Sequence, residues 1–261
     1  MEIELNNKIA VVTGGAVGLG KSLVKKLAES GAKVIFTSRN DVELKKLSSE
    51  LGSEHLGILG DVTKSEDIDR LHQEANDRFG GVDILVNNVG HTLGVNEPYV
   101  GKAEWMRVMD LNFLTHVEVT NKFLPYMKER DWGRIINITS IAGLEVSGPA
   151  PFNAAKAALT SYTRSVGRLL AMENRNVVMT AVAPGVVVTE GGHWEKILKE
   201  NPAHAEKYLK DRTALGRFGT IDEVCDIVVF LASDKASFFQ GSIIQVDGGQ
   251  SRHYMYHNYL D

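Results

Sequence analysis

The sequence lacks the features of several protein classes. It contains one cysteine, Cys225, so no intramolecular disulfide can form, and a reducing compartment suits it. The net charge is -4, which argues against a nucleic-acid partner because such a partner requires a basic face. No apolar run approaches the roughly 18 residues of a membrane span, and residues 1–7 lack the apolar segment of a signal peptide. We therefore expect a cytoplasmic protein with no nucleic-acid and no membrane partner.

Short apolar strands alternate with longer amphipathic helices along the whole chain. The apolar runs carry little polar alternation, which is typical of strands buried on both faces of a parallel sheet. Ser65 is expected to cap one helix and Pro125 to bend another. The expected strands are 8–13, 33–37, 56–59, 84–87, 134–139, 177–182 and 242–246, and the helices are 19–30, 42–51, 65–79, 103–128, 151–172 and 221–232.

This order predicts an α/β fold: a single Rossmann-type doubly wound domain over residues 1–261, with a seven-stranded, mostly parallel sheet and helices on both faces. Residues 186–212 do not follow this alternation of short strands and helices, and we interpret them as a substrate lid. Trp194, Ile197 and Leu198 could give this lid an apolar inner face. Its basic residues suit either an anionic substrate or simple solvation, and His193 with Glu190 would suit a sugar-like substrate. The basic residues are Lys196, Lys199, Lys207, Lys210 and Arg212.

A glycine-rich turn follows the first expected strand. Gly14 permits a tight turn, Gly18 lets the backbone approach a pyrophosphate, and Gly20 lets the next helix pack closely. The amino end of that helix offers free N–H groups and a positive dipole to phosphates. Between a strand and a helix, this pattern predicts a dinucleotide site.

The end of the second strand indicates which dinucleotide is preferred. Ser38 stands where an NAD site usually has a carboxylate, and Arg39 beside it could pair with a 2′-phosphate. We therefore expect NADP(H) as the cofactor. Asp61, followed by Val62 after the third strand, could accept a hydrogen bond from the adenine amino group, or could instead cap the next turn.

Together these motifs resemble the short-chain dehydrogenase/reductase family over essentially the whole chain. The matching residues are Thr13-Gly14-Gly15-Ala16-Val17-Gly18-Leu19-Gly20, Asn87-Asn88-Val89-Gly90, Asn112, Ser140, Lys156, Pro184-Gly185 and Val246-Asp247-Gly248-Gly249, with Val89 in place of the family's usual alanine.

The resemblance implies roles for individual residues. Asn112 would hold a water of a proton relay, Ser140 would bind the substrate oxygen, and Lys156 would bind the nicotinamide ribose and lower the pKa of a neighbouring tyrosine. Asn87 would shape the floor beside the cofactor. The cofactor contacts it implies are Gly14, Ala16, Val17, Gly18, Leu19, Ser38, Arg39, Asp61, Val62, Asn88, Val89, Gly90, Lys156, Pro184, Gly185, Val187 and Thr189.

Phe152 departs from the family pattern. It stands four residues before Lys156, where the family has its proton-donating tyrosine, and its ring has no hydroxyl. The segment between Ser140 and Phe152 is also one residue short. Three interpretations are open: Phe152 is an engineered change that stalls an otherwise complete enzyme; another residue donates the proton, with His91, Glu145 and His193 as candidates; or the protein only binds dinucleotide and ligand.

The expected function is NADP(H)-dependent interconversion of a carbonyl and an alcohol on a small polar substrate, such as a sugar or a 3-oxoacyl compound, with turnover impaired by Phe152. The alternative is a non-catalytic NADP(H)-binding sensor or partner subunit. The resemblance also implies a homo-oligomer, a tetramer or dimer. The tail 251–261, with Tyr254, Met255, Tyr256 and Tyr259, could pack on a neighbouring subunit, and no metal is expected, although His253 and His257 have helical spacing.

Overall fold

The computed structural model describes residues 3–173 and 176–251, so the expectations for residues 252–261 lie outside its description. Within the described ranges the chain forms seven strands, in the sheet order β3-β2-β1-β4-β5-β6-β7. Every pairing is parallel, which confirms the predicted sheet. The strands are β1 (Ile9–Val12), β2 (Lys33–Ser38), β3 (Leu56–Leu59), β4 (Ile84–Asn87), β5 (Gly133–Ile138), β6 (Val177–Pro184) and β7 (Ile243–Val246).

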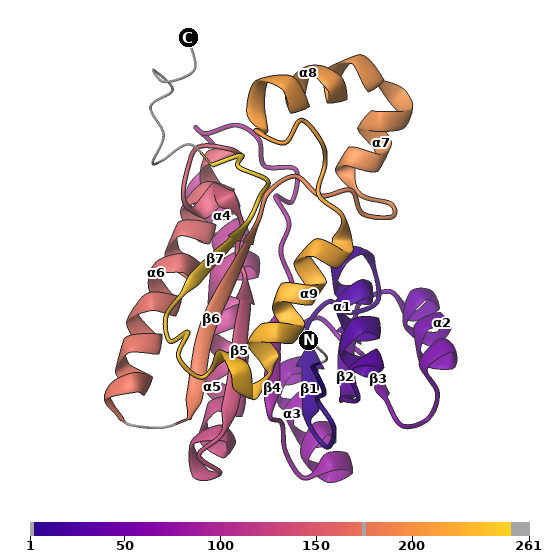
Figure 1. Ribbon diagram of the computed structural model, residues 1–261, viewed down its shortest axis with the longest axis vertical. Helices are drawn as coiled ribbons and strands as arrows, with labels where there is room; N and C mark the ends of the chain where they lie inside the picture. Colours follow the sequence, from indigo (N-terminus) through magenta and orange to yellow (C-terminus); the bar gives the residue numbers. More distant parts are fainter. Residues whose placement is uncertain (1–2, 174–175, 252–261) are drawn as a thin grey trace.

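Helices cover both faces of the sheet (Figure 1). Ala10 and Val12 pack into one core, whereas Val11 between them packs into the other, so the strand must be apolar throughout. One face is covered by α1 (Gly18–Glu29), α2 (Asp41–Leu51) and α9 (Ile221–Ala232); the other is covered by α3 (Ser65–Phe79), α5 (Thr115–Glu129) and α6 (Ala150–Met172).

Local sequence signals explain where several helices begin. Thr220 and Glu223 form a reciprocal capping box at the start of α9. The Asn40 side chain accepts hydrogen bonds from the Val42 and Glu43 amides and so caps α2. The prediction that Ser65 caps α3 is wrong: Lys64 is the cap residue and makes no side-chain cap bond, so Ser65 is the first helical residue.

The helix expected at 103–128 contains an irregular turn. It consists of α4 (Lys102–Met109), a π-helical segment η1 (Asp110–Leu114) and α5, which contains Pro125. The wider π turn leaves carbonyl groups for other donors, and such turns are frequent at functional sites. Here the Asn112 side chain donates to the Val108 carbonyl at 2.8 Å. The π turn thus places Asn112 beside the end of β4.

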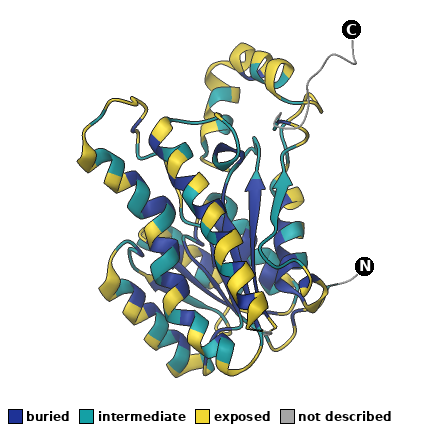
Figure 2. Ribbon diagram, turned by 90° about the vertical axis from the view of Figure 1, so that its left-hand side faces the viewer, coloured by how far each residue is buried: buried dark blue, intermediate teal, exposed yellow. Residues whose placement is uncertain are grey.

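Two further helices lie beyond the carboxyl ends of the strands. They are α7 (His193–Glu200) and α8 (Pro202–Arg212), at the top of Figure 1. Much of their surface is exposed, unlike the dark-blue strands beneath (Figure 2). No helix among the described residues is long and apolar enough to cross a membrane.

Candidate active site

A cavity of about 900 Å³ opens beyond the carboxyl ends of the strands. Its volume suits a large organic ligand. The sheet order reverses between β1 and β4, which is where ligands bind in doubly wound sheets. The predicted residues that line it are Gly14, Val17, Leu19, Gly20, Ser38, Arg39, Asp61, Val62, Asn88, Val89, Gly90, Ser140, Phe152, Lys156, Pro184 and Gly185.

The glycine turn between β1 and α1 requires the absence of side chains. A Cβ at Gly20 would lie 2.1 Å from the Gly14 carbonyl oxygen, so no larger residue fits there. The Asn88 side chain donates to the carbonyls of Thr13 and Gly14 at 3.0 and 3.2 Å, which ties this turn to the end of β4. The backbone at this end of the cavity is therefore held in a fixed shape.

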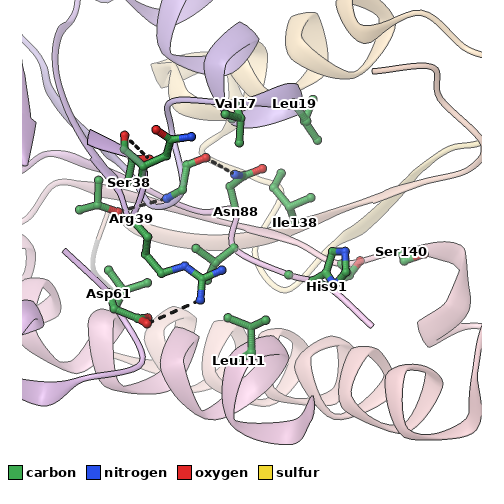
Figure 3. Close-up of a pocket in the computed structure, with 18 of the residues that line it drawn as sticks. Val17, Leu19, Ser38, Arg39, Asp61, Asn88, His91, Leu111, Ile138 and Ser140 are labelled. Carbon is green, nitrogen blue, oxygen red and sulfur yellow. Dashed lines mark hydrogen bonds and ion pairs between the residues drawn. The ribbon is translucent and has the colours of Figure 1, made fainter. Parts of the chain in front are cut away.

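The end of β2 presents a cation to the cavity. Arg39 has a two-thirds exposed side chain, and its guanidinium lies 3.6 Å from the Asp61 carboxylate. A dashed line marks this ion pair in Figure 3. Thr63 donates two hydrogen bonds to Asp61, through its amide at 3.1 Å and its hydroxyl at 2.8 Å. Burial raises the pKa of Asp61, but the Thr63 hydrogen bonds and nearby Arg39 outweigh burial and bring it below its ordinary value. Asp61 therefore caps its own turn through Oδ1, and it also lines the cavity, so its expected contact with adenine stays a prediction.

The opposite end of the cavity holds Ser140, Phe152 and Lys156. Helix α6 places Phe152 and Lys156 one turn apart, and the Lys156 ammonium lies 5.7 Å from the centroid of the Phe152 ring. That ammonium is buried and donates to the Ile138 carbonyl at 2.9 Å. The Ser140 hydroxyl accepts from the Ala142 amide at 3.1 Å, which fixes its position after β5. Figure 3 shows Ser140 far along the pocket from Arg39.

Burial changes the acid–base behaviour of two side chains near this end. Loss of water lowers the pKa of Lys156 to about 7. His116, in helix α5, is completely buried. Burial together with the positive charge of Lys156 lowers the pKa of the His116 imidazole to about 3, so the imidazole is neutral. His116 donates to the Val89 carbonyl at 2.8 Å through Nε2, and its Nδ1 has no hydrogen-bond partner within residues 3–173 and 176–251.

Asn112 lies behind the cavity wall. Its side-chain oxygen accepts from the His91 amide at 3.0 Å, and its nitrogen donates to the His91 carbonyl at 2.9 Å. His91 itself lines the cavity, and its Nδ1 accepts from the Leu93 amide at 2.8 Å. Asn112 thus holds the backbone of a cavity residue. Any contact with a ligand would have to pass through that backbone or through water.

Four other residues expected at the cofactor also fall outside the cavity lining: Ala16, Gly18, Val187 and Thr189. Ala16 is buried inside the glycine turn, and Val187 forms an isolated bridge with Gly219 at the root of the lid. Gly18 has a positive φ of 53° and faces Thr189. Asn87 is completely buried and donates to Thr120 and Asn137 instead.

The sequence prediction missed several lining residues: Thr37, Asn40, Asp41, Gly60, Leu111, Ile138 and Thr139. Most of them directly neighbour predicted residues at the carboxyl ends of strands. A prediction that included every residue at the carboxyl ends of the strands would have found these neighbouring residues. Leu111 is different, because the π turn alone brings it to the wall.

Helices α7 and α8, in the segment predicted to be a lid, pack on one another. Trp194 of α7 packs on Tyr208 of α8 with ring centroids 4.4 Å apart and on Phe218 at 5.1 Å, so these three rings form a small aromatic cluster. Lys196, Lys199 and Lys207 form i,i+4 ion pairs with acidic residues of their own helices. These three lysines therefore do not present a free positive patch to an anionic substrate.

Of the alternative proton donors, His91 lines the cavity, whereas Glu145 and His193 do not.

Comparison with known proteins agrees with this geometry. The profile of a family described as enoyl-(acyl carrier protein) reductase matches residues 14–251. The chain is 34% identical over 254 residues to 3-oxoacyl-[acyl-carrier-protein] reductase FabG of Aquifex aeolicus, covering 95% of this chain and 99% of that one. It is 33% identical over 255 residues to dehydrogenase/reductase SDR family member 4 of Oryctolagus cuniculus, covering 94% of each.

A solved structure is also similar. L-Sorbose reductase from Gluconobacter frateurii, complexed with NADPH and L-sorbose, superposes with a TM-score of 0.87 and 26% identity, over 96% of this chain and 98% of that one. The chain belongs to the short-chain dehydrogenase/reductase family, a family of oxidoreductases, as its motifs predict.

Proposed function

We propose that this protein is an NADP(H)-dependent oxidoreductase that interconverts a carbonyl and an alcohol on a small polar substrate. The observation that carries the proposal is a single cavity with Arg39 at one end and Ser140 with Lys156 at the other. A dinucleotide needs a cationic site for its 2′-phosphate, a side-chain-free turn for its pyrophosphate and polar groups at its reactive ring. A 3-oxoacyl compound or a sugar is the expected substrate class, by analogy with the relatives named above.

The residues present fit such a cofactor. No Cβ fits at Gly20, so this part of the turn carries no side chain. The backbone N–H groups at the start of α1 can therefore approach a phosphate directly. Val17 and Leu19 would flank the pyrophosphate, and Arg39 would pair with the 2′-phosphate. When bound, the nicotinamide supplies or removes a hydride. Ser140 would then hold the substrate oxygen, and Lys156 would place its positive charge near that oxygen.

Phe152 would make this site slow. Hydride transfer to a carbonyl builds negative charge on the oxygen, and a positioned acid typically contributes about 10²–10⁴-fold to the rate. The phenyl ring has no proton to give. We therefore expect Phe152→Tyr to raise NADPH-dependent carbonyl reduction by about 10²-fold or more.

The test compares the chain with its Phe152→Tyr variant on ketones, keto-sugars and 3-oxoacyl thioesters, following NADPH oxidation. The matched control is Phe113→Tyr, which adds the same hydroxyl to a phenylalanine that packs on Tyr162 instead of lining the cavity. Equal activity of the Phe152→Tyr variant and the unchanged chain would refute the impairment. Binding of NADPH without turnover in either would favour the second candidate, a non-catalytic NADP(H)-binding sensor or partner subunit, which the missing hydroxyl supports.

A further inference from the structure

The buried ammonium of Lys156 lies one helical turn from Phe152, 5.7 Å from the centroid of its ring. We propose that Lys156 itself protonates the substrate oxygen during reduction in this chain, and removes that proton during oxidation. The inference rests on the proposed function and deepens it, because it names the group that carries the proton when residue 152 is phenylalanine. Lys156 then acts as a catalytic residue and not only as a ribose ligand.

The position of the ammonium supports this role. Lys156 Nζ lies at the inner wall of the cavity, where a Cβ on Gly90 would be only 2.9 Å from it, so the nitrogen is packed directly against the chain after β4. One N–H bond is directed to the Ile138 carbonyl. The other two have no hydrogen-bond acceptor among the described residues. With no hydroxyl on Phe152, a substrate oxygen or one bridging water can reach these two N–H bonds.

The surroundings allow the proton to leave. Among the described residues no carboxylate forms an ion pair with Lys156, so nothing fixes the positive charge. The titratable group that interacts electrostatically with it is His116, from α5, whose pKa the positive charge of Lys156 lowers. His91, from the chain after β4, lines the same cavity, as do Ser140 and Phe152. Because His116 is neutral, it adds no charge beside Lys156. Burial brings the pKa of Lys156 to about 7, which suits a general acid near neutral pH.

The proposed step is balanced. In reduction, the carbonyl carbon would gain a hydride, which a bound dihydronicotinamide would supply while it is oxidised to nicotinamide. The C–O π bond breaks toward oxygen, and the oxygen takes a proton from the Lys156 ammonium as a new O–H bond forms. Lys156 is left as a neutral amine, which regains a proton from solvent. The reverse sequence oxidises the alcohol and leaves Lys156 protonated.

One experiment measures Lys156 without turnover. Cofactor-free protein with 13C at lysine Cε is titrated by NMR, and Lys156→Met identifies the Lys156 resonance by its loss. We expect this resonance to titrate within about one pH unit of 7, whereas ordinary exposed lysines titrate near 10.4. A Lys156 resonance that titrates above about pH 10 would overturn the proposal, because such an amine stays charged and cannot cycle a proton near neutrality.

A second experiment follows the pH dependence of kcat at saturating NADPH. Reduction requires the ammonium, so kcat should fall as pH rises through the Lys156 pKa. Lys156→Arg keeps a cation but cannot release a proton, so kcat should drop about 10²–10⁴-fold and this pH limb should vanish. The NADPH affinity of this variant is measured alongside, so that saturation is reached, because Lys156 would also bind the nicotinamide ribose. His91→Gln should keep the limb in place. Loss of the limb in His91→Gln, or its survival in Lys156→Arg, would overturn the assignment.

These arms separate the two proposals. A chain that does not bind NADPH refutes the proposed function and with it this inference, whatever the NMR titration gives. A chain that binds NADPH and reduces no carbonyl at any pH overturns the proton-donor role. A chain that reduces carbonyls while Lys156 titrates above about pH 10 keeps the proposed function and loses the inference alone.

Discussion

Removal of the guanidinium at the end of β2 is the sharpest test of the cofactor preference. Arg39 lines the cavity and has a two-thirds exposed side chain that forms an ion pair with Asp61 at 3.6 Å. We expect Arg39→Ala to weaken NADPH binding and to leave NADH binding nearly unchanged. The reason is that only NADPH carries the 2′-phosphate that this cation would meet.

The magnitude follows from the exposure of the side chain. A hydrogen bond to a charged group contributes roughly 1.5–3 kcal/mol, and solvent at this exposed site reduces that figure. Competition from the Asp61 carboxylate reduces it further. We therefore expect a loss of about 1–2 kcal/mol, which is roughly a 5- to 30-fold increase in the Kd for NADPH.

The assay is a fluorescence or calorimetric titration with each dinucleotide at low and at high salt. Arg130→Ala is the matched control, since Arg130 is an exposed arginine at the end of α5 and does not line the cavity. High salt should reduce the difference between Arg39→Ala and the unchanged chain. Equal effects on NADPH and NADH, or no effect on either, would show that Arg39 does not read the 2′-phosphate.

Three further outcomes are expected. Gly20→Ala should abolish dinucleotide binding, because its Cβ would lie 2.1 Å from the Gly14 oxygen, whereas Gly101→Ala, with open space around it, should bind normally; calorimetry distinguishes them. His116 has a folded pKa of about 3, below its ordinary value of 6.5, so the unfolded chain binds more protons between these values. The free energy of unfolding should therefore fall as pH drops from 6.5 toward 3, by up to about 4 kcal/mol from this group, and denaturant titrations of His116→Gln should lack that contribution. Light scattering should give the mass of a dimer or tetramer, in keeping with the fully exposed Phe238 side chain; a monomer would contradict the expected homo-oligomer.

The strands and most helices could be predicted because burial on both faces leaves a plain apolar pattern. Helix α9 and strand β4 begin and end where the sequence places them. The π turn could not be predicted, since one additional residue in a turn barely changes the spacing of apolar side chains. It is this turn that puts Leu111 on the cavity wall and Asn112 behind it.

The residues of the candidate site likewise divide into those that the sequence locates and those that it does not. The positions of Gly14, Gly20 and Arg39 follow from strand–turn–helix order, so the sequence places them at the cavity, whereas Gly18 falls outside its lining. The burial of His116 does not follow from any local pattern, because a histidine inside a helix can face solvent or core. The lid lysines are a different case: their partners stand four residues away, so the sequence already contained the evidence that Lys199 and Lys207 are paired.

The way α7 and α8 pack on one another has a consequence for how such proteins diversify. Trp194 packs on Tyr208 and three lysines pair within their own helices. The ties from this segment to the rest of the chain include the Val187–Gly219 bridge, the Lys21–Glu190 pair at 3.8 Å, the hydrogen bond from Gln250 to the Tyr208 hydroxyl at 2.8 Å and the packing of Trp194 on Phe218. A segment built in this way can be exchanged for another without rebuilding the sheet below. Grafting the corresponding segment of a relative onto this chain should transfer substrate choice while the dinucleotide preference stays with Arg39.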